Sequence, residues 1–140
     1  MGCPIIWKSQ LQTEVALSST ESEYTGLSYA LRDAIPIMNL LKEMKSRDIK
    51  HLSSHKAKVS CRVFEDNSGA LHMAKIHKYR PRTKHLNVKL HHFRSYVEDG
   101  SISIEKIDTK EQLADYLTKP LAEDILIKLR KMVIWLCFKL

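Results

Sequence analysis

Segments with strand-like and helix-like patterns alternate along this chain, and their order leaves few classes of fold. Between residues 20 and 47, apolar residues recur every three or four positions, which is the period of an amphipathic helix. The segments "KVSCRVF" (58–64) and "SISIEKI" (101–107) alternate in polarity and are rich in β-branched residues, as half-buried strands are. A helix-like segment follows each of them. The sequence therefore predicts a domain of the α/β class.

Further segments extend this pattern on both sides. Residues 4–19 hold two short extended pieces, "PIIW" and "VALSS", which we interpret as a hairpin. Helices are expected to begin near Asn67, to run over 85–100 with a stop at Gly100, and to cover 109–120.

The length of 140 residues and the 44% of hydrophobic residues suit one packed domain. We expect this domain over 4–120, followed by an amphipathic C-terminal helix over 121–140. Pro36 is expected to kink the long first helix, because proline lacks the amide donor that a helix interior needs.

One segment carries the excess positive charge of the chain, which is +7 in total. Residues 75–94 contain Lys, Arg and His but no Asp or Glu, whereas Lys and Arg elsewhere equal the acidic residues in number. Such a segment favours an anionic partner such as nucleic acid. His91 and His92 are adjacent on a predicted helix and point in different directions, so they form a poor metal chelate. The side chains expected to contact a phosphate backbone are Lys78, Arg80, Arg82, Lys84 and His85.

The cysteines and the chain ends bear on the cellular setting. Cys3, Cys61 and Cys137 are too far apart to define a disulfide framework or a zinc site, which favours a reduced environment. The start "MGCPIIW" lacks the basic and apolar regions of a signal peptide, and the longest apolar run, "MVIWLCF", is too short to span a membrane. We therefore expect a soluble, intracellular protein without a membrane partner.

Three acidic residues stand where strands meet the helices that follow them. Glu23 lies in the first turn of the long helix, Asp66 follows the "KVSCRVF" strand, and Asp115 lies on the helix after "SISIEKI". Strand ends and helix starts meet at one edge of an open α/β sheet, so these carboxylates are expected to converge. Magnesium accepts oxygen ligands of this kind, and two such ions about 4 Å apart promote phosphodiester cleavage. The pattern therefore indicates a magnesium-dependent nuclease site.

Each acid also has a structural explanation. Thr20 with Glu23, and Ser18 with Glu21, match the S/T-x-x-E capping box, so either glutamate is a candidate for a helix-capping role. Either Asp66 or the residue after it, Asn67, is a candidate N-cap, and Asp115 is spaced to pair with Lys119 on one helix face.

Four sequence motifs of the chain resemble those of a known protein family. "VALSSTESEYTGL", "EDNSGAL", "RTKHLNVKLHHF" and "QLADYLTKPL", in this order and spacing, resemble the ribonuclease H domain at the C-terminal end of the reverse transcriptase in copia-type LTR retrotransposon polyproteins. The resemblance runs from about Ile6 to Leu121. It implies a ribonuclease H-like fold with a mixed sheet that cleaves the RNA strand of RNA/DNA hybrids with two magnesium ions. By motif, it implies Glu23, Asp66 and Asp115 as the catalytic, metal-binding acids.

The resemblance also implies an aspartate on a central first strand, upstream of the element that "IIW" resembles. We therefore expect an N-terminally truncated domain that lacks this strand, binds magnesium weakly and cleaves poorly. Three hypotheses follow: an impaired magnesium-dependent endonuclease, a non-catalytic fragment that binds nucleic acid, or an interaction module completed by an upstream reverse transcriptase chain that supplies the strand. The expected location is the cytoplasm or a virus-like particle.

Overall fold

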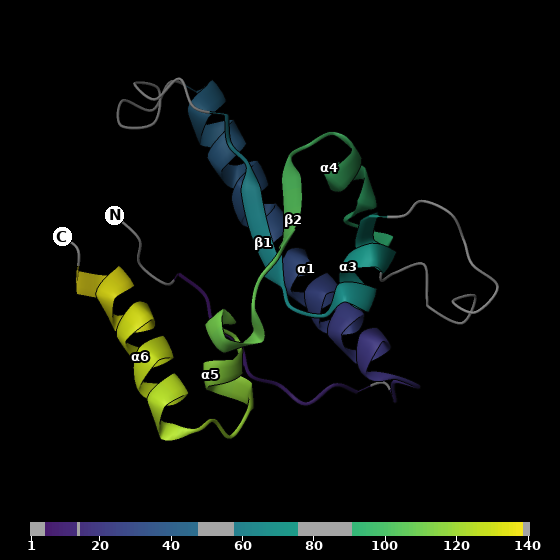
Figure 1. The fold of residues 1–140 in the computed structure, drawn as a ribbon. Coiled ribbons are helices and arrows are strands. Elements are labelled where there is room, and N and C mark those ends of the chain that lie inside the picture. The colour runs from purple at the N-terminus through teal and green to yellow at the C-terminus, as the bar shows by residue number, and fades with distance from the viewer. Residues whose placement is uncertain (1–4, 14, 48–57, 76–90, 139–140) are drawn as a thin grey trace. The chain divides into compact units, whose positions relative to one another are not determined.

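The computed structural model describes residues 5–13, 15–47, 58–75 and 91–138, with side chains described as far as residue 133 (Figure 1). The chain forms two compact units. One unit is Ala16–Lys106, and the other combines Met1–Val15 with Ile107–Leu140. The sequence-based division into residues 4–120 and 121–140 stays a prediction.

The unit Ala16–Lys106 begins with a long helix, α1 (Ser19–Ser46), which the apolar period predicts correctly. Its buried side chains recur at three- and four-residue intervals and therefore share one face. The helix continues through Pro36 as a single element. The buried face comprises Tyr24, Thr25, Leu27, Ser28, Leu31, Ile35 and Met38.

Two strands pair in parallel beside this helix. They are β1 (Cys61–Glu65) and β2 (Ile102–Lys106), and the register pairs Cys61 with Ile102 and Glu65 with Lys106. Both strands were predicted from their alternating patterns, and the mixed α/β class is confirmed in the described residues. A parallel pair needs a crossover connection, and the described part of this connection contains two α-helices, α3 (Ser68–Lys75) and α4 (Arg94–Glu98).

The predicted helix over 85–100 is only partly within the described residues. Helix α4 occupies its last part, and residues 85–90 fall outside the description. The predicted stop at Gly100 is confirmed, because this residue has a φ angle of 71°. Only glycine adopts this left-handed conformation without a steric penalty from a Cβ atom, so the chain turns here from α4 into β2.

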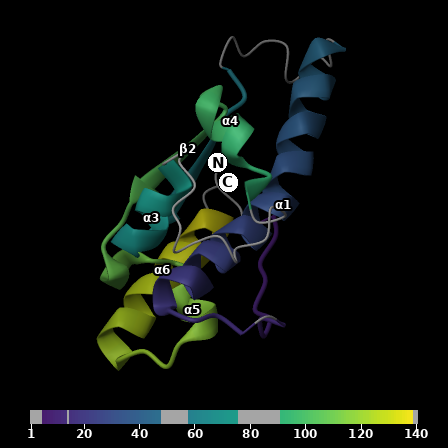
Figure 2. The ribbon, with the colours of Figure 1, turned by 90° about the vertical axis from the view of Figure 1, so that its right-hand side faces the viewer.

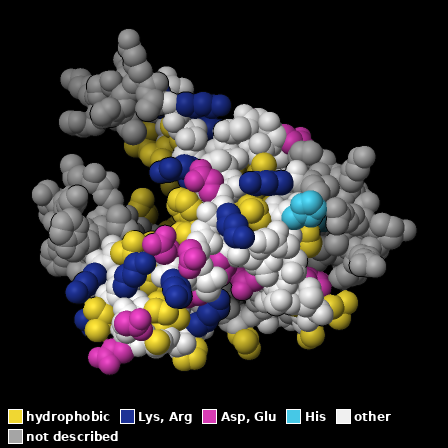
Figure 3. Space-filling model, viewed as in Figure 1, with side chains coloured by type: hydrophobic (Ala, Val, Ile, Leu, Met, Phe, Trp, Pro, Cys, Tyr) yellow, Lys and Arg dark blue, Asp and Glu magenta, His cyan; other side chains and the backbone are white. Residues whose placement is uncertain are grey.

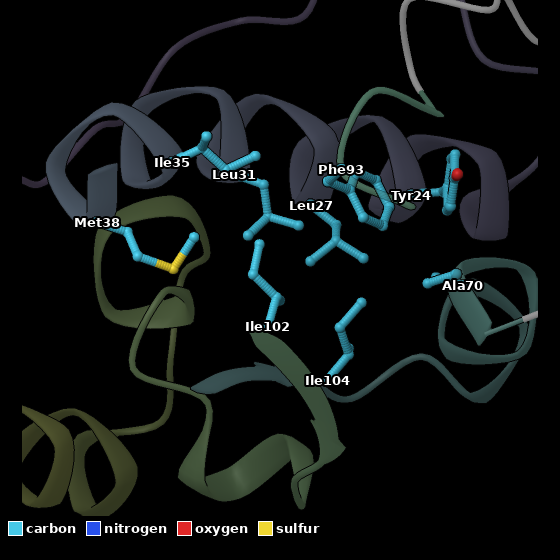
Figure 4. Packing of buried hydrophobic residues seen from close by; sticks show 10 residues of the cluster. Tyr24, Leu27, Leu31, Ile35, Met38, Ala70, Phe93, Ile102 and Ile104 are labelled. Atoms are coloured by element: carbon cyan, nitrogen blue, oxygen red, sulfur yellow. The ribbon is translucent and has the colours of Figure 1, made fainter. Parts of the chain in front are cut away.

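The hydrophobic core lies between α1 and the sheet. Figure 4 shows Leu27 and Leu31 of α1 pointing toward Ile102 and Ile104 of β2, and Figure 2 shows α1 as a separate layer beside the strands. Phe93 closes the same core and is fully buried. Burial of each such side chain contributes roughly 2 kcal/mol to folding, so the core fixes the start of α1 relative to the strands.

The other unit has no strand among its described residues, and the hairpin predicted over 4–19 is wrong for residues 5–13 and 15–18. The apolar side chains that suggested strands are exposed there: Leu11 and Val15 each have a relative exposure of 92%. An isolated hairpin gains little stability in water unless one face is buried, and these side chains have no such cover.

The helix predicted over 109–120 is divided in two. A 3-10 helix, η3 (Thr109–Glu111), ends at Gln112, whose backbone is extended, and the short helix α5 (Asp115–Thr118) follows. Asp108 favours this early turn because its side chain accepts a hydrogen bond from the Lys110 amide at 2.8 Å. The last helix, α6 (Glu123–Phe138), confirms the predicted C-terminal helix. None of the described helices combines the length and apolar character needed to cross a lipid bilayer.

Candidate metal centre at the start of two helices

The first turn of α1 is capped by residues other than Glu23. Ser18 Oγ accepts a hydrogen bond from the Glu21 amide at 3.2 Å, and Glu21 Oε2 accepts one from the Leu17 amide at 2.9 Å. Ser18 is therefore the N-cap, and the predicted capping role of Glu21 is confirmed. Thr20 lies inside the helix, which excludes the alternative capping box of Thr20 with Glu23.

The start of α3 is capped by Asn67. Its Oδ1 accepts hydrogen bonds from the amides of Gly69 at 2.9 Å and Ala70 at 3.1 Å. This decides between the two predicted N-caps, because Asn67 supplies the oxygen that the helix needs. Asp66, the residue between the end of β1 and this cap, is partly exposed.

Three carboxylates converge where β1 ends and α1 begins. Glu23, Glu65 and Asp66 each offer one oxygen, and these oxygens lie within 4.8 Å of one another. We call these three residues the acidic cluster. Two of the three predicted acids, Glu23 and Asp66, are thus brought together although they are far apart in the sequence.

Glu65 is the member of this cluster that the sequence did not single out. It is the last residue of β1, has a relative exposure of 5%, and accepts a hydrogen bond from the Asn67 amide at 3.0 Å. Neighbouring strand residues normally point to opposite faces, which argues against two adjacent ligands. Asp66 lies just beyond the strand, where this alternation no longer applies. The sequence signal that could have identified Glu65 is its position directly before Asp66.

Ionised carboxylates at this spacing repel one another. Two unit charges about 5 Å apart repel by roughly 3 kcal/mol at an effective dielectric constant of about 20, and by less than about 1 kcal/mol in water. In an octahedral magnesium shell, opposite oxygen ligands lie about 4 Å apart and neighbouring ones about 3 Å apart, so the oxygens of the cluster would close by up to about 2 Å to bind one ion. The all-oxygen donor set, once drawn together in this way, suits a hard divalent cation.

Asp115 has different surroundings. It belongs to the other unit, is the first residue of α5, and is buried. Its Oδ1 lies 2.9 Å from Lys119 Nζ, so the predicted i,i+4 ion pair forms. The role of Asp115 as a third metal ligand stays a prediction.

A tyrosine and a histidine anchor the helix turn that carries Glu23. The hydroxyl of Tyr24, which is fully buried, shares a hydrogen bond of 2.6 Å with His91 Nδ1. The Tyr24 ring also packs at an angle on Phe93, with ring centroids 5.8 Å apart. Burial lowers the pKa of His91, and the positive charge of Arg94 lowers it further. The neutral imidazole is therefore favoured beside Tyr24.

The predicted phosphate-contacting residues lie outside the described part of the chain. They are Lys78, Arg80, Arg82, Lys84 and His85, all within residues 76–90. On the face drawn in Figure 3, basic and acidic side chains of the described residues are interspersed. Those described side chains thus form no large field of one sign on that face, and the basic interface stays a prediction.

Comparisons with known proteins find sequence similarity to polyproteins of plant transposons. It is 35% identical over 118 residues to the retrovirus-related Pol polyprotein from transposon TNT 1-94 of Nicotiana tabacum, which covers 84% of this chain and 8% of the relative. It is also 34% identical over 119 residues to the retrovirus-related Pol polyprotein from transposon RE2 of Arabidopsis thaliana, covering 85% of this chain and 8% of the relative. A second Arabidopsis thaliana relative, from transposon RE1, is 33% identical over the same length of 119 residues.

No protein-family model matches the chain, and no solved structure does either. The chain spans less than a tenth of the length of these relatives, because each alignment covers 8% of the polyprotein. Over most of its own length, the chain is therefore similar to one short region of the retrovirus-related Pol polyproteins of plant transposons.

Proposed function

We propose that this chain is the ribonuclease H region of a copia-type retrotransposon polyprotein, and that its activity is magnesium-dependent endonucleolytic cleavage of RNA in RNA/DNA hybrids. One observation carries the proposal. Glu23 and Asp66, each assigned from its own motif, place carboxylate oxygens within 4.8 Å of each other. The similarity to Pol polyproteins supports the same assignment.

The proposed roles follow from the surroundings of each acid. Glu23 and Asp66 would bind the metal, since Ser18 and Asn67 supply the side-chain oxygens that cap the two helices. Asp115 is proposed as a third ligand on the strength of its motif. Magnesium, when bound, supplies an activated water and charge stabilisation for the leaving oxygen. The basic residues from Lys78 to His85 are proposed to hold the phosphate backbone of the hybrid.

The fold proposed for the chain is the ribonuclease H-like fold with a mixed sheet. The parallel pairing of β1 with β2, and the layer that α1 forms on the sheet, support it. The resemblance implies one more aspartate on a strand upstream of Ile6. We propose that a reverse transcriptase segment supplies this strand and its carboxylate, and that the chain by itself cleaves weakly.

Cleavage of an RNA strand labelled at its end, paired with DNA, tests the proposal. Four polypeptides are compared with magnesium present: this chain, the chain fused to the stretch that precedes the matched region in a Pol relative (the polymerase fusion), and the Asp66→Asn variant of each. We expect strong cutting by the fusion, weak cutting by the chain, and loss of both with Asp66→Asn. Absence of cutting by the fusion would contradict the proposal, and hybrid binding without turnover would instead support a non-catalytic binding fragment.

A further inference from the structure

The first turns of α1 and α3 touch at a glycine. A Cβ atom added to Gly69 would lie 2.8 Å from both Cγ2 and Oγ1 of Thr20, and 3.1 Å from Asn67 Oδ1. Carbon atoms do not approach other heavy atoms this closely, so any side chain at position 69 would force a displacement. The absence of a side chain at Gly69 therefore allows the present distance between the two helices.

Thr20 has little freedom to yield to a larger residue. It branches at Cβ, and both of its branch atoms face Gly69. Rotation about χ1 moves one branch atom away but leaves a heavy atom in one of the two facing positions. A methyl group at position 69 must therefore move the helix backbones rather than one side chain.

Hydrogen bonds join this contact to the end of β1. Asn67 Oδ1 caps α3 and also accepts a longer hydrogen bond from Thr20 Oγ1 at 3.5 Å, and the Asn67 amide donates to Glu65 Oε1 at 3.0 Å. The path from β1 through the α3 cap to α1 is thus continuous, and Asn67 lies at its centre. This path is what fixes the turn on which Asp66 stands.

The contact between Gly69 and Thr20 affects the acidic cluster because two of its carboxylates lie close along the chain to the residues of this contact. Glu23 lies three residues after Thr20, on the same side of α1, and Asp66 directly precedes Asn67. The separation of the two helix starts therefore sets the separation of the two carboxylates. We propose that Gly69 is a positioning residue which, with Thr20 and Asn67, holds Glu23 and Asp66 close enough to share one divalent cation. This inference rests on the proposed function.

Binding of Mn²⁺ alone, followed by the electron paramagnetic resonance signal of the free ion, tests the inference without a nucleic-acid substrate. We expect Gly69→Ala to weaken Mn²⁺ binding about tenfold, the loss typical of displaced ligand geometry. The double variant Gly69→Ala with Thr20→Ala removes both 2.8 Å contacts and leaves only the 3.1 Å contact with Asn67 Oδ1, so it is expected to bind nearly as Thr20→Ala does. Thr20→Ile crowds the same contact from α1 and serves where Gly69→Ala does not fold.

Thermal unfolding in EDTA separates this effect from a loss of stability. If Gly69 did not position the two carboxylates, its replacement by alanine, a better helix former, would leave Mn²⁺ binding equal to that of the parent chain. Equal binding by the two, or failure of Thr20→Ala to rescue, would overturn this inference alone. If the parent chain bound no Mn²⁺, either alone or as the polymerase fusion, both the proposed function and the inference about Gly69 would be overturned.

Discussion

The acidic cluster and Asp115 place carboxylates in opposite electrostatic surroundings. In the cluster, Glu23, Glu65 and Asp66 bring three acidic groups within 4.8 Å, whereas Asp115 has the ammonium group of Lys119 2.9 Å away. The motifs predict that Glu23, Asp66 and Asp115 act together, and only the contacts of each residue reveal this difference in surroundings. A carboxylate with a cation on its own helix turn has a structural role already, whereas the three close carboxylates of the cluster form an oxygen donor set of the kind that divalent cations bind.

Asp66→Asn is expected to produce the largest effect. The substitution keeps the size of the side chain and removes a ligand charge, so cleavage of the RNA strand by the polymerase fusion should fall by at least about 100-fold. Asp124→Asn, at an exposed acid in the first turn of α6, is the matched control and should leave the cleavage rate within about twofold. Equal rates for these two variants would remove Asp66 from the site.

Asp115→Asn tests whether the carboxylate that pairs with Lys119 takes part in cleavage. If Asp115 binds the metal, removing its charge should lower the cleavage rate about 100-fold. Lys119→Met breaks the same ion pair but keeps the carboxylate, so it should cost only a few fold. Similar small losses for both variants would show that Asp115 acts only through Lys119.

Glu65→Gln is expected to change metal affinity and stability in opposite directions. The amide oxygen of Gln keeps the acceptor for the Asn67 amide and removes one of three repelling charges. Without metal, the free energy of unfolding should rise by up to about 1 kcal/mol, while Mn²⁺ affinity falls about tenfold. Glu105→Gln on β2 is the control, and a stability gain of the same size there would argue against repulsion at Glu65.

Tyr24→Phe tests the anchor of the turn that carries Glu23. It removes the hydrogen bond to His91 and keeps the buried ring, so the free energy of unfolding should fall by about 1 kcal/mol. Chemical denaturation measures this loss. The variant Tyr29→Phe, at a partly buried residue on the same helix, is a suitable comparison. An unchanged stability of Tyr24→Phe would show that ring packing alone holds the turn.

The smallest expected effect is a pH dependence from His91. Its pKa in the folded chain is lowered from the ordinary histidine value of 6.5, so the unfolded chain binds more protons between the two pKa values. Stability is therefore fully present above pH 6.5 and declines as the pH falls from there toward the folded pKa. Denaturation midpoints between pH 8 and pH 5, compared with those of His91→Gln, would show a flatter profile for the variant.

Much of the unit Ala16–Lys106 was predictable because each element carries its own local signal. The apolar period gave α1, polarity alternation gave β1 and β2, and a positive φ angle at Gly100 follows from its place after a helix. The pairing of Glu23 with Asp66 was also predictable, since strand ends and helix starts meet at one sheet edge.

Other features depend on contacts that local patterns do not encode. The hairpin predicted around Leu11 and Val15 fails because nothing in the described residues buries those side chains. Glu65 joins the acidic cluster because the strand ends at that residue, and strand ends are the least certain part of a sequence-based assignment. The closeness of Gly69 to Thr20 likewise needs the packed helices to become visible.

The parallel register of β1 and β2 also has a kinetic consequence. Cys61 can pair with Ile102 only after the whole connection through α3 and α4 has closed into a loop. Loop closure costs chain entropy before the ladder returns any free energy, so parallel pairing is slow compared with helix formation. The acidic cluster needs the end of β1 in place, and β2 is the ladder partner of β1 in the described residues, so we expect the cluster to reach its final geometry only after this slow pairing.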